Sequence, residues 1–95
     1  MIEMKKGEKI RVIARSSDGW ITFKKNNFIA QIKIYDEPSE FGIDGGRISK
    51  LVITKQSIGW NNPLISYDRG WDKKITKTTS RNAIKFYKTI LKNFN

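Results

Sequence analysis

Four carboxylates crowd into residues 35–46, YDEPSEFGIDGG, a stretch that contains no Lys or Arg. Carboxylates this close in sequence suit three roles: binding a calcium ion, acid–base catalysis, or pairing with arginines. The order of the acids does not match the EF-hand pattern, and no motif indicates the substrate cleft that catalysis requires. We therefore favour a structural role, in which the acids pair with Arg47, Arg69 or a basic segment near the C-terminus. Contact with a partner protein is the alternative, and its candidate residues are Glu37, Glu40 and Asp44.

Histidine and cysteine are both absent from the 95 residues. The chain therefore lacks the commonest zinc ligand, any thiolate, and the side chain that most readily acts as a general base near neutral pH. No catalytic or metal-binding motif appears elsewhere in the sequence. We expect no enzymatic activity, no metal site and no cofactor.

Positive charge is concentrated near the C-terminal end of the chain. The sequence carries 19 Lys and Arg against nine Asp and Glu, a net charge of +10, and residues 73–95 contain seven of these bases and no acid. Four of the seven have a spacing that places them in one stripe along a helix, where they would attract phosphates. A solvated helix face is the alternative interpretation. The candidates for holding phosphates of nucleic acid or of a nucleotide are Lys77, Arg81, Lys85, Lys88 and Lys92.

The three tryptophans indicate a second route to nucleic acid, because exposed aromatic rings in a basic groove stack on the bases of single strands. Tryptophan in a small domain more often packs in or near the core, and we expect two of the three to do so. Trp60 lies in a turn rich in Gly and Asn, so it is the candidate for an exposed stacking residue.

Five segments have the composition and the period-two alternation of β-strands. The first three follow one another through short polar turns, which favours an antiparallel meander. The expected strands are residues 8–15, 19–25, 27–36, 46–55 and 62–71.

The pattern changes from residue 78 onward, where apolar residues recur at the i, i+3, i+4 and i+7 spacing of an amphipathic helix. Strands followed by one helix predict an α+β fold, an antiparallel sheet of about five strands packed by one C-terminal amphipathic helix. We expect a single domain over residues 1–95, mainly β over 1–72 and helical over 77–94. The expected apolar face is Ala83, Ile84, Tyr87, Ile90, Leu91 and Phe94, with Thr78, Thr79 or Ser80 as the N-terminal cap.

No apolar run approaches the roughly 20 residues that a membrane-spanning helix needs. The first residues, MIEMKKGEKIRVIAR, mix acids with lysines and lack the apolar core of a signal peptide. The apolar face of the expected helix is needed to cover the sheet, which leaves it unable to insert into a membrane surface. We expect a cytoplasmic protein that does not bind membranes.

Two blocks of the sequence resemble a family of small uncharacterised proteins found in phages and prophages. In that family a YDEPS-FGI-GGRISKL block is followed by a YDRGW block, and here the two read YDEPSEFGIDGGRISKL and YDRGW. The resemblance covers residues 28–72, and the lysine-rich KKITK after Asp72 departs from it. It implies no particular activity. It does imply a phage context, in which small accessory proteins often disarm host defences or manage phage nucleic acid.

Two hypotheses for the function follow from these features. The first is a non-catalytic basic module of phage type that binds nucleic acid or nucleotide phosphates through the C-terminal helix. The second is an anti-defence inhibitor, similar to an anti-CRISPR protein, that binds a host defence protein through the acidic stretch and nearby aromatic residues. Either protein would act in the cytoplasm of the host cell. Exposed strand edges could pair between two copies, so a homodimer is an alternative to a monomer.

Overall fold

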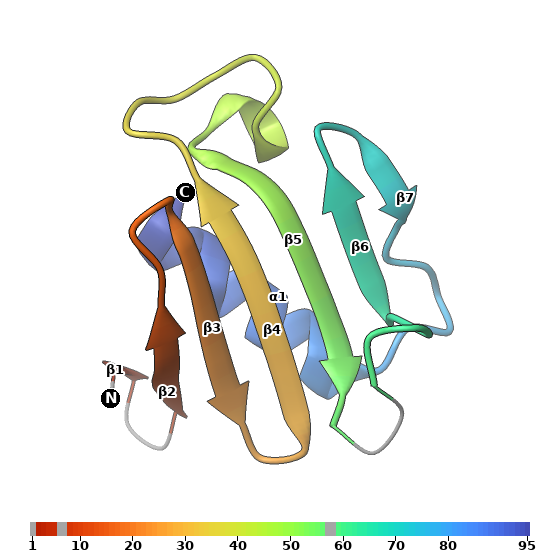
Figure 1. Ribbon diagram of the computed structural model, residues 1–95. Coiled ribbons are helices and arrows are strands. Elements are labelled where there is room, and N and C mark those ends of the chain that lie inside the picture. Colours follow the sequence, from red (N-terminus) through yellow and green to blue (C-terminus); the bar gives the residue numbers. More distant parts are fainter. Residues whose placement is uncertain (1, 6–7, 57–58) are drawn as a thin grey trace.

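The computed structural model describes residues 2–5, 8–56 and 59–95, with the side chains of 10–56 and 59–95. Within these residues the chain forms seven β-strands, a short 3₁₀ helix and one α-helix (Figure 1). The elements are β1 (Ile2–Lys5), β2 (Glu8–Arg15), β3 (Trp20–Lys25), β4 (Phe28–Ile34), η1 (Ile43–Gly45), β5 (Ile48–Lys55), β6 (Ile65–Asp68), β7 (Trp71–Lys73) and α1 (Arg81–Phe94).

The strands pair in chain order, and each runs antiparallel to the next. Short turns make this arrangement possible. Between β3 and β4, for example, Lys25 pairs with Phe28 across a two-residue turn in which Asn26 has a φ of 54°. Asparagine tolerates this left-handed conformation, so the turn matches the twist of the flanking strands. The α+β fold expected from the sequence, an antiparallel sheet with one C-terminal helix, is confirmed.

The expected strands omit β1, and two boundaries differ clearly from the expected ones. The segment 62–71 does not form one strand, because Arg69 adopts a φ of 54° and turns the chain between β6 and β7. A strand of three residues such as β7 is too short to show the alternation by which strands are recognised. The helix begins at Arg81 rather than at residue 77, and a threonine-rich turn occupies the residues before it.

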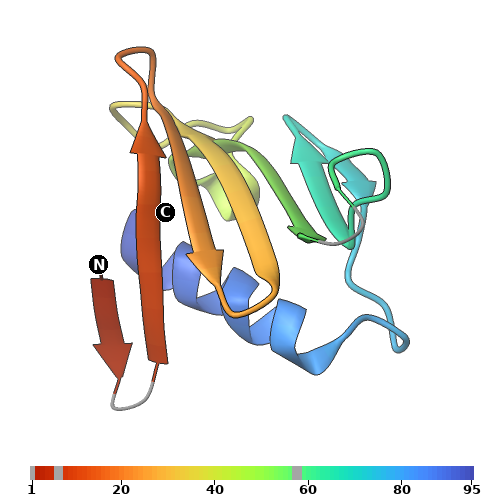
Figure 2. The ribbon, with the colours of Figure 1, turned by 60° about the horizontal axis from the view of Figure 1, so that its bottom comes forward.

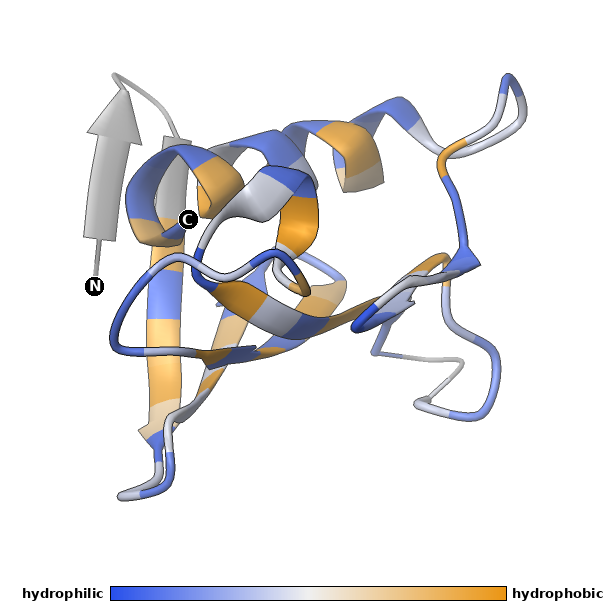
Figure 3. Cartoon of the chain, turned by 90° about the horizontal axis from the view of Figure 1, so that it is seen from above, coloured by the Kyte–Doolittle hydropathy of each residue, from blue (hydrophilic) through white to orange (hydrophobic). Residues whose placement is uncertain are grey.

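The helix α1 lies across one face of the sheet and covers the core (Figure 2). Along α1 and along the strands, hydrophobic and hydrophilic residues alternate as bands of orange and blue (Figure 3). The sheet contributes alternate residues to the core, including Phe23, Ile32, Leu51, Ile53 and Ile65. Burying one such side chain stabilises the fold by about 1.5–3 kcal/mol, so this face is committed to packing.

The buried face of α1 is rotated relative to the expected one. Phe86, which the expected apolar set omits, is fully buried, while Ile84, which the set includes, is only half-buried. Thr89 is also buried, and its Oγ1 is satisfied by donating to the Lys85 carbonyl at 2.9 Å. Near the end of the helix, the Phe94 ring lies 4.9 Å from the Phe23 ring of β3. In the middle of the helix, the Tyr87 ring lies 5.9 Å from the Trp71 ring of β7. The helix therefore spans the sheet from β7 to β3.

Across the described part of the chain, no helix is both long and apolar enough to pass through a membrane.

Candidate functional site

Four cations of α1 form an exposed row that we call the basic stripe: Arg81, Lys85, Lys88 and Lys92. All four side chains are exposed, while Ala83, Phe86 and Ile90 are fully buried beneath the sheet. Because a helix turns about 100° per residue, this division puts the stripe on the side of α1 that faces away from the sheet.

The basic stripe has no acidic partner among the side chains of 10–56 and 59–95. The ion pairs found there are Lys50–Asp68 at 3.8 Å and Arg69–Asp68 at 3.7 Å, and neither involves the helix. Like charges three or four residues apart on a helix repel each other. The stripe is therefore a patch of uncompensated positive charge within the described part of the molecule.

Lys77 lies outside the helix, in the turn that precedes it. The Thr79 hydroxyl accepts a hydrogen bond from the Thr76 backbone N–H at 2.8 Å, which closes this turn. Ser80 occupies the N-cap position, but its side chain makes no capping hydrogen bond. Lys77 thus lies near the positive end of the helix dipole, where the first N–H groups of α1 have no side-chain cap.

The acidic stretch 35–46, which we call the acidic loop, is held by hydrogen bonds rather than by ion pairs. The Asn95 side chain accepts from the Ile48 N–H at 3.0 Å and donates to the Ile43 carbonyl at 2.9 Å. The Tyr67 hydroxyl donates to the Phe41 carbonyl at 2.8 Å. These neutral contacts fix the loop against the helix end and β6.

The expected pairing of the acids with arginines is wrong for the side chains that the structure describes. Arg47 instead donates from Nε to the Tyr35 carbonyl at 3.0 Å, and Arg69 pairs with Asp68 of its own hairpin. No ion pair to the acidic loop is found in the described ranges, and its four carboxylates are exposed. The backbone hydrogen bonds of the bend leave no need for charge pairing.

Glycine is required in this loop for close approach. A Cβ on Gly42 would collide with the Gly46 carbonyl, and a Cβ on Gly46 would collide with the Asn95 side chain. Gly45 has a φ of 73°, which favours glycine for a different reason. Beside these glycines the Phe41 side chain is 53% exposed and lines a hollow with Tyr35, Asp68 and Arg69.

The expectation for the tryptophans is correct for Trp60 and Trp71 and wrong for Trp20. Trp60 is 43% exposed, while Trp20 and Trp71 are half-buried. Trp71 packs edge-on against Tyr67, with ring centroids 5.0 Å apart. Trp20 does not join the core, and its neighbours are two lysine ammonium groups. Sequence reasoning missed this cluster because its members come from three different strands.

Two ionisable groups in the described residues have clearly shifted pKa values. Burial raises the pKa of Tyr87 to about 12, and the Asp44 carboxylate adds to the shift. The hydrogen bond from the Ser16 hydroxyl lowers the pKa of the exposed Asp18. Within the described ranges, no group of three acidic side chains is arranged to hold a metal ion.

Comparison with known proteins gives one match. Residues 16–95 match the model of a family described as a domain of unknown function (DUF7678). The match extends beyond residues 28–72, on which the resemblance to phage proteins rests, and it includes β3 and α1. No curated protein and no solved structure matches the chain.

Proposed function

We propose that this chain, which belongs to the DUF7678 family of unknown function, is a non-catalytic module of phage type that binds nucleic acid or nucleotide phosphates through α1. The observation that supports this proposal is the basic stripe, which is exposed and has no acidic partner in the described ranges. Lys77 would extend the site toward the helix N-terminus. The phage context comes from the two sequence blocks of residues 35–51 and 67–71.

Electrostatics favours a polyanion over a single small ion. Each Lys or Arg that neutralises a phosphate releases a condensed counterion, so several cations in a row give strong and salt-sensitive binding. A bound phosphate backbone also relieves the repulsion between neighbouring stripe residues. No catalytic step is part of the proposal, because the chain contains neither His nor Cys. The site of action would be the cytoplasm of the host cell.

The test compares two variants of equal net charge. In the stripe variant Lys85, Lys88 and Lys92 are changed to Gln, and in the control variant Arg15, Lys25 and Lys55 are changed to Gln. We expect the stripe variant to bind duplex DNA at least about tenfold more weakly at low salt. The slope of log affinity against log salt should also fall by about 2–3.

The control variant should lose much less affinity, because its cations lie on strands and not in the stripe. Equal losses in the two variants would mean that only net charge matters. Affinity for duplex DNA no greater than for heparin would reduce the proposal to general polyanion binding. The stripe variant should remain folded, since it removes like charges from neighbouring turns.

A second candidate function is supported by the acidic loop. Its carboxylates are exposed on a chain of net charge +10, and Phe41 is 53% exposed among them. An apolar side chain surrounded by uncompensated charge is typical of a protein-binding surface. The partner would be a host defence protein with a basic surface, and the chain would act as an anti-defence inhibitor.

A pull-down from host lysate, treated with nuclease, tests this candidate. Changing Glu37, Glu40 and Asp44 together to Lys should abolish capture of one defence component. The stripe variant serves as the matched control, since it should capture the same protein. Capture that persists in the acidic-loop variant would rule out the loop as the contact surface.

A further inference from the structure

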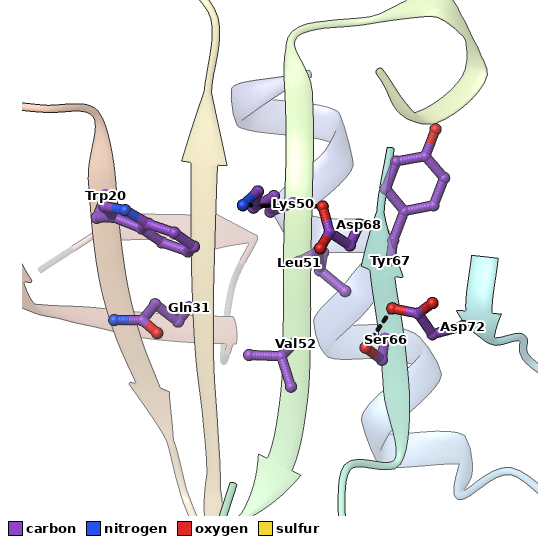
Figure 4. Close-up of a pocket in the computed structure, with 9 residues that line it drawn as sticks. All are labelled: Trp20, Gln31, Lys50, Leu51, Val52, Ser66, Tyr67, Asp68 and Asp72. Carbon is purple, nitrogen blue, oxygen red and sulfur yellow. Dashed lines mark hydrogen bonds and ion pairs between the residues drawn. The ribbon is translucent and has the colours of Figure 1, made fainter. Parts of the chain in front are cut away.

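The face of the sheet opposite α1 carries side chains that the core does not use. The strand register sends alternate residues to this open face, away from the helix (Figure 2). One row across four strands reads Trp20, Lys33, Lys50 and Asp68, and the next reads Thr22, Gln31, Val52 and Ser66. Side chains from both rows line the shallow hollow in Figure 4.

Of the two aromatic residues that line this hollow, Trp20 and Tyr67, Tyr67 belongs to the core and Trp20 does not. The Trp20 ring is half-buried and points from β3 toward β4. The ammonium groups of Lys33 and Lys50 lie 5.7 Å and 5.9 Å from the centre of the ring. An aromatic ring with two cations beside it suits a planar base whose phosphates the cations can hold.

Two like charges meet in this cluster, and within the described side chains only one of them has an ion-pair partner. Lys33 and Lys50 are directly opposite each other on β4 and β5, where like charges destabilise a sheet. Lys50 pairs with Asp68 at 3.8 Å, and Lys33 makes no ion pair in the described ranges. A bound anion would relieve the repulsion between the two lysines.

We propose that the open face binds single-stranded nucleic acid, with one base stacked on Trp20 and the adjacent phosphates held by Lys33 and Lys50. The lysine side chains are flexible. When a base stacks on the Trp20 ring, the two ammonium groups can therefore move away from the ring and contact the phosphates. Bases in a duplex already stack on each other, so only an unpaired base can reach the ring. Thr22, Gln31 and Ser66 supply donors and acceptors for base edges.

Two carboxylates limit the path of the strand. Asp68 and Asp72 lie at the β6–β7 end of the hollow, where they repel phosphates. Toward β2 the surface stays positive. Arg11 of β2 and Lys24 of β3 are opposite each other in the strand register and extend the positive charge. The phosphates therefore run across the sheet from β2 to Lys50 on β5 and end before the carboxylates of Asp68 and Asp72.

This inference rests on the proposed function in that the ligand is nucleic acid, and it adds a second site with a preference for unpaired strands. The basic stripe and the open face lie on opposite sides of the sheet, so each site can be removed without touching the other (Figure 2). Failure of one site is therefore distinguishable from failure of the other.

The test uses a labelled homopyrimidine strand of about 12 nucleotides, within the range that single-strand-binding domains cover, and a duplex of equal length. Fluorescence anisotropy gives the affinity for each probe. Each variant is made in the wild-type protein and in the stripe variant, because strand binding by the basic stripe would otherwise hide a loss of affinity at the open face. We expect Trp20→Ala to weaken single-strand binding about 5- to 150-fold. Duplex binding should change by less than about twofold, because stacking on an unpaired base is lost only for the single strand.

Three further variants complete the design. Trp20→Phe keeps a stacking ring and should retain most of the affinity. Trp60→Ala tests the competing prediction that Trp60 is the stacking residue. Trp60 is exposed but lies outside the two rows of the open face, so its loss should change single-strand affinity much less than Trp20→Ala does. Changing Lys33 and Lys50 to Gln should lower the single-strand salt slope by about 1.4, which reports phosphate contact even if Trp20→Ala fails to fold.

Several results would overturn the proposal. These are an unchanged affinity in Trp20→Ala, a loss in Trp60→Ala instead, an equal loss for strand and duplex, or a free mononucleotide that binds as tightly as the strand. Both sites are supported if the stripe variant loses duplex affinity and Trp20→Ala still lowers single-strand affinity in that background. If the stripe variant loses duplex affinity but Trp20→Ala leaves single-strand affinity unchanged, only the proposed function remains.

Discussion

At the scale of single residues, neutral side chains hold the parts of the molecule that charged ones were expected to hold. The Tyr67 hydroxyl and the Asn95 amide bond the backbone of the acidic loop directly. Hydrogen bonds of this kind keep their strength at high salt, whereas exposed ion pairs do not. The carboxylates of the loop are therefore not needed for its shape.

Tyr87 should make stability fall at alkaline pH. Burial and the Asp44 carboxylate raise its pKa from 10.0 to about 12 in the folded protein. Between these values the unfolded chain loses the phenol proton while the folded chain keeps it, so the unfolded state binds fewer protons. The free energy of unfolding should then drop by up to about 1.4 kcal/mol per pH unit between about pH 10 and 12, and be unaffected by this group below pH 10.

Denaturant unfolding at several pH values between 9 and about 12 checks this expectation. Tyr87→Phe removes the titrating group and should flatten the alkaline decline. Tyr35→Phe, at a half-exposed tyrosine, is the control and should behave like the wild type. An identical decline in Tyr87→Phe would show that another group is responsible.

At the scale of elements, α1 serves two surfaces at once. Its buried side completes the core, with Phe86 and Ile90 fully enclosed, and its outer side presents the basic stripe. Its C-terminal end is tied to the acidic loop through Asn95. The helix thus fixes the position of the loop as well as that of the stripe.

Asn95→Ala should loosen the acidic loop. The change removes two hydrogen bonds: the Ile48 N–H, on a fully buried residue, loses its bond to the Asn95 side chain, and the Ile43 carbonyl keeps only the bond from the Gly46 N–H. We expect a loss of about 1–3 kcal/mol in the free energy of unfolding, together with faster hydrogen exchange at the Ile48 amide. Denaturant unfolding and amide exchange measure the two effects.

Asn93→Ala provides the matched control for this change. The Asn93 amide donates only to the Thr89 carbonyl of its own helix, at 2.8 Å, among the described contacts. Its loss should leave the loop unaffected. Slow exchange at Ile48 in Asn95→Ala would mean that the backbone bonds of the loop suffice without the clamp.

At the scale of the whole molecule, the sheet separates the charged surfaces. The basic stripe is on the outer side of α1, and the open face with Trp20 is on the opposite side of the sheet (Figure 2). The acidic loop connects β4 to β5 at one end of the sheet (Figure 1). Two nucleic-acid sites on opposite faces would act independently. They would also differ in chemistry, since one depends on phosphates alone and the other adds base stacking.

This arrangement predicts a stoichiometry that depends on salt. Short single strands should occupy two sites per chain at low salt and one at high salt, because binding by the stripe falls more steeply as salt rises. The site that remains should disappear in Trp20→Ala. Native mass spectrometry or calorimetric titration at two salt concentrations measures the number of strands bound. A single site at low salt would contradict the arrangement.

The sequence by itself determined the elements that show a regular period. The alternation in β2 to β5 and the helical spacing after residue 78 predict the α+β fold, since hydrophobic periodicity is a local property of the chain. The exposure of the basic stripe follows from the helical spacing, and that of Trp60 follows from the composition of its turn. The strand β7 and the start of α1 at Arg81 departed from the expected pattern, because short elements and helix ends carry little periodic signal. Phe86 keeps the helical spacing with Ala83 and Ile90, so its burial was predictable from the sequence.

Only the tertiary structure decided which distant residues meet. The contact of Asn95 with Ile43 and Ile48, and the row of Trp20, Lys33 and Lys50, join residues that no local pattern relates. The same holds for Arg47, which bonds the Tyr35 carbonyl in preference to an acid. Strand register and helix docking set such contacts, and both are fixed by packing of the whole core rather than by neighbouring residues in the chain.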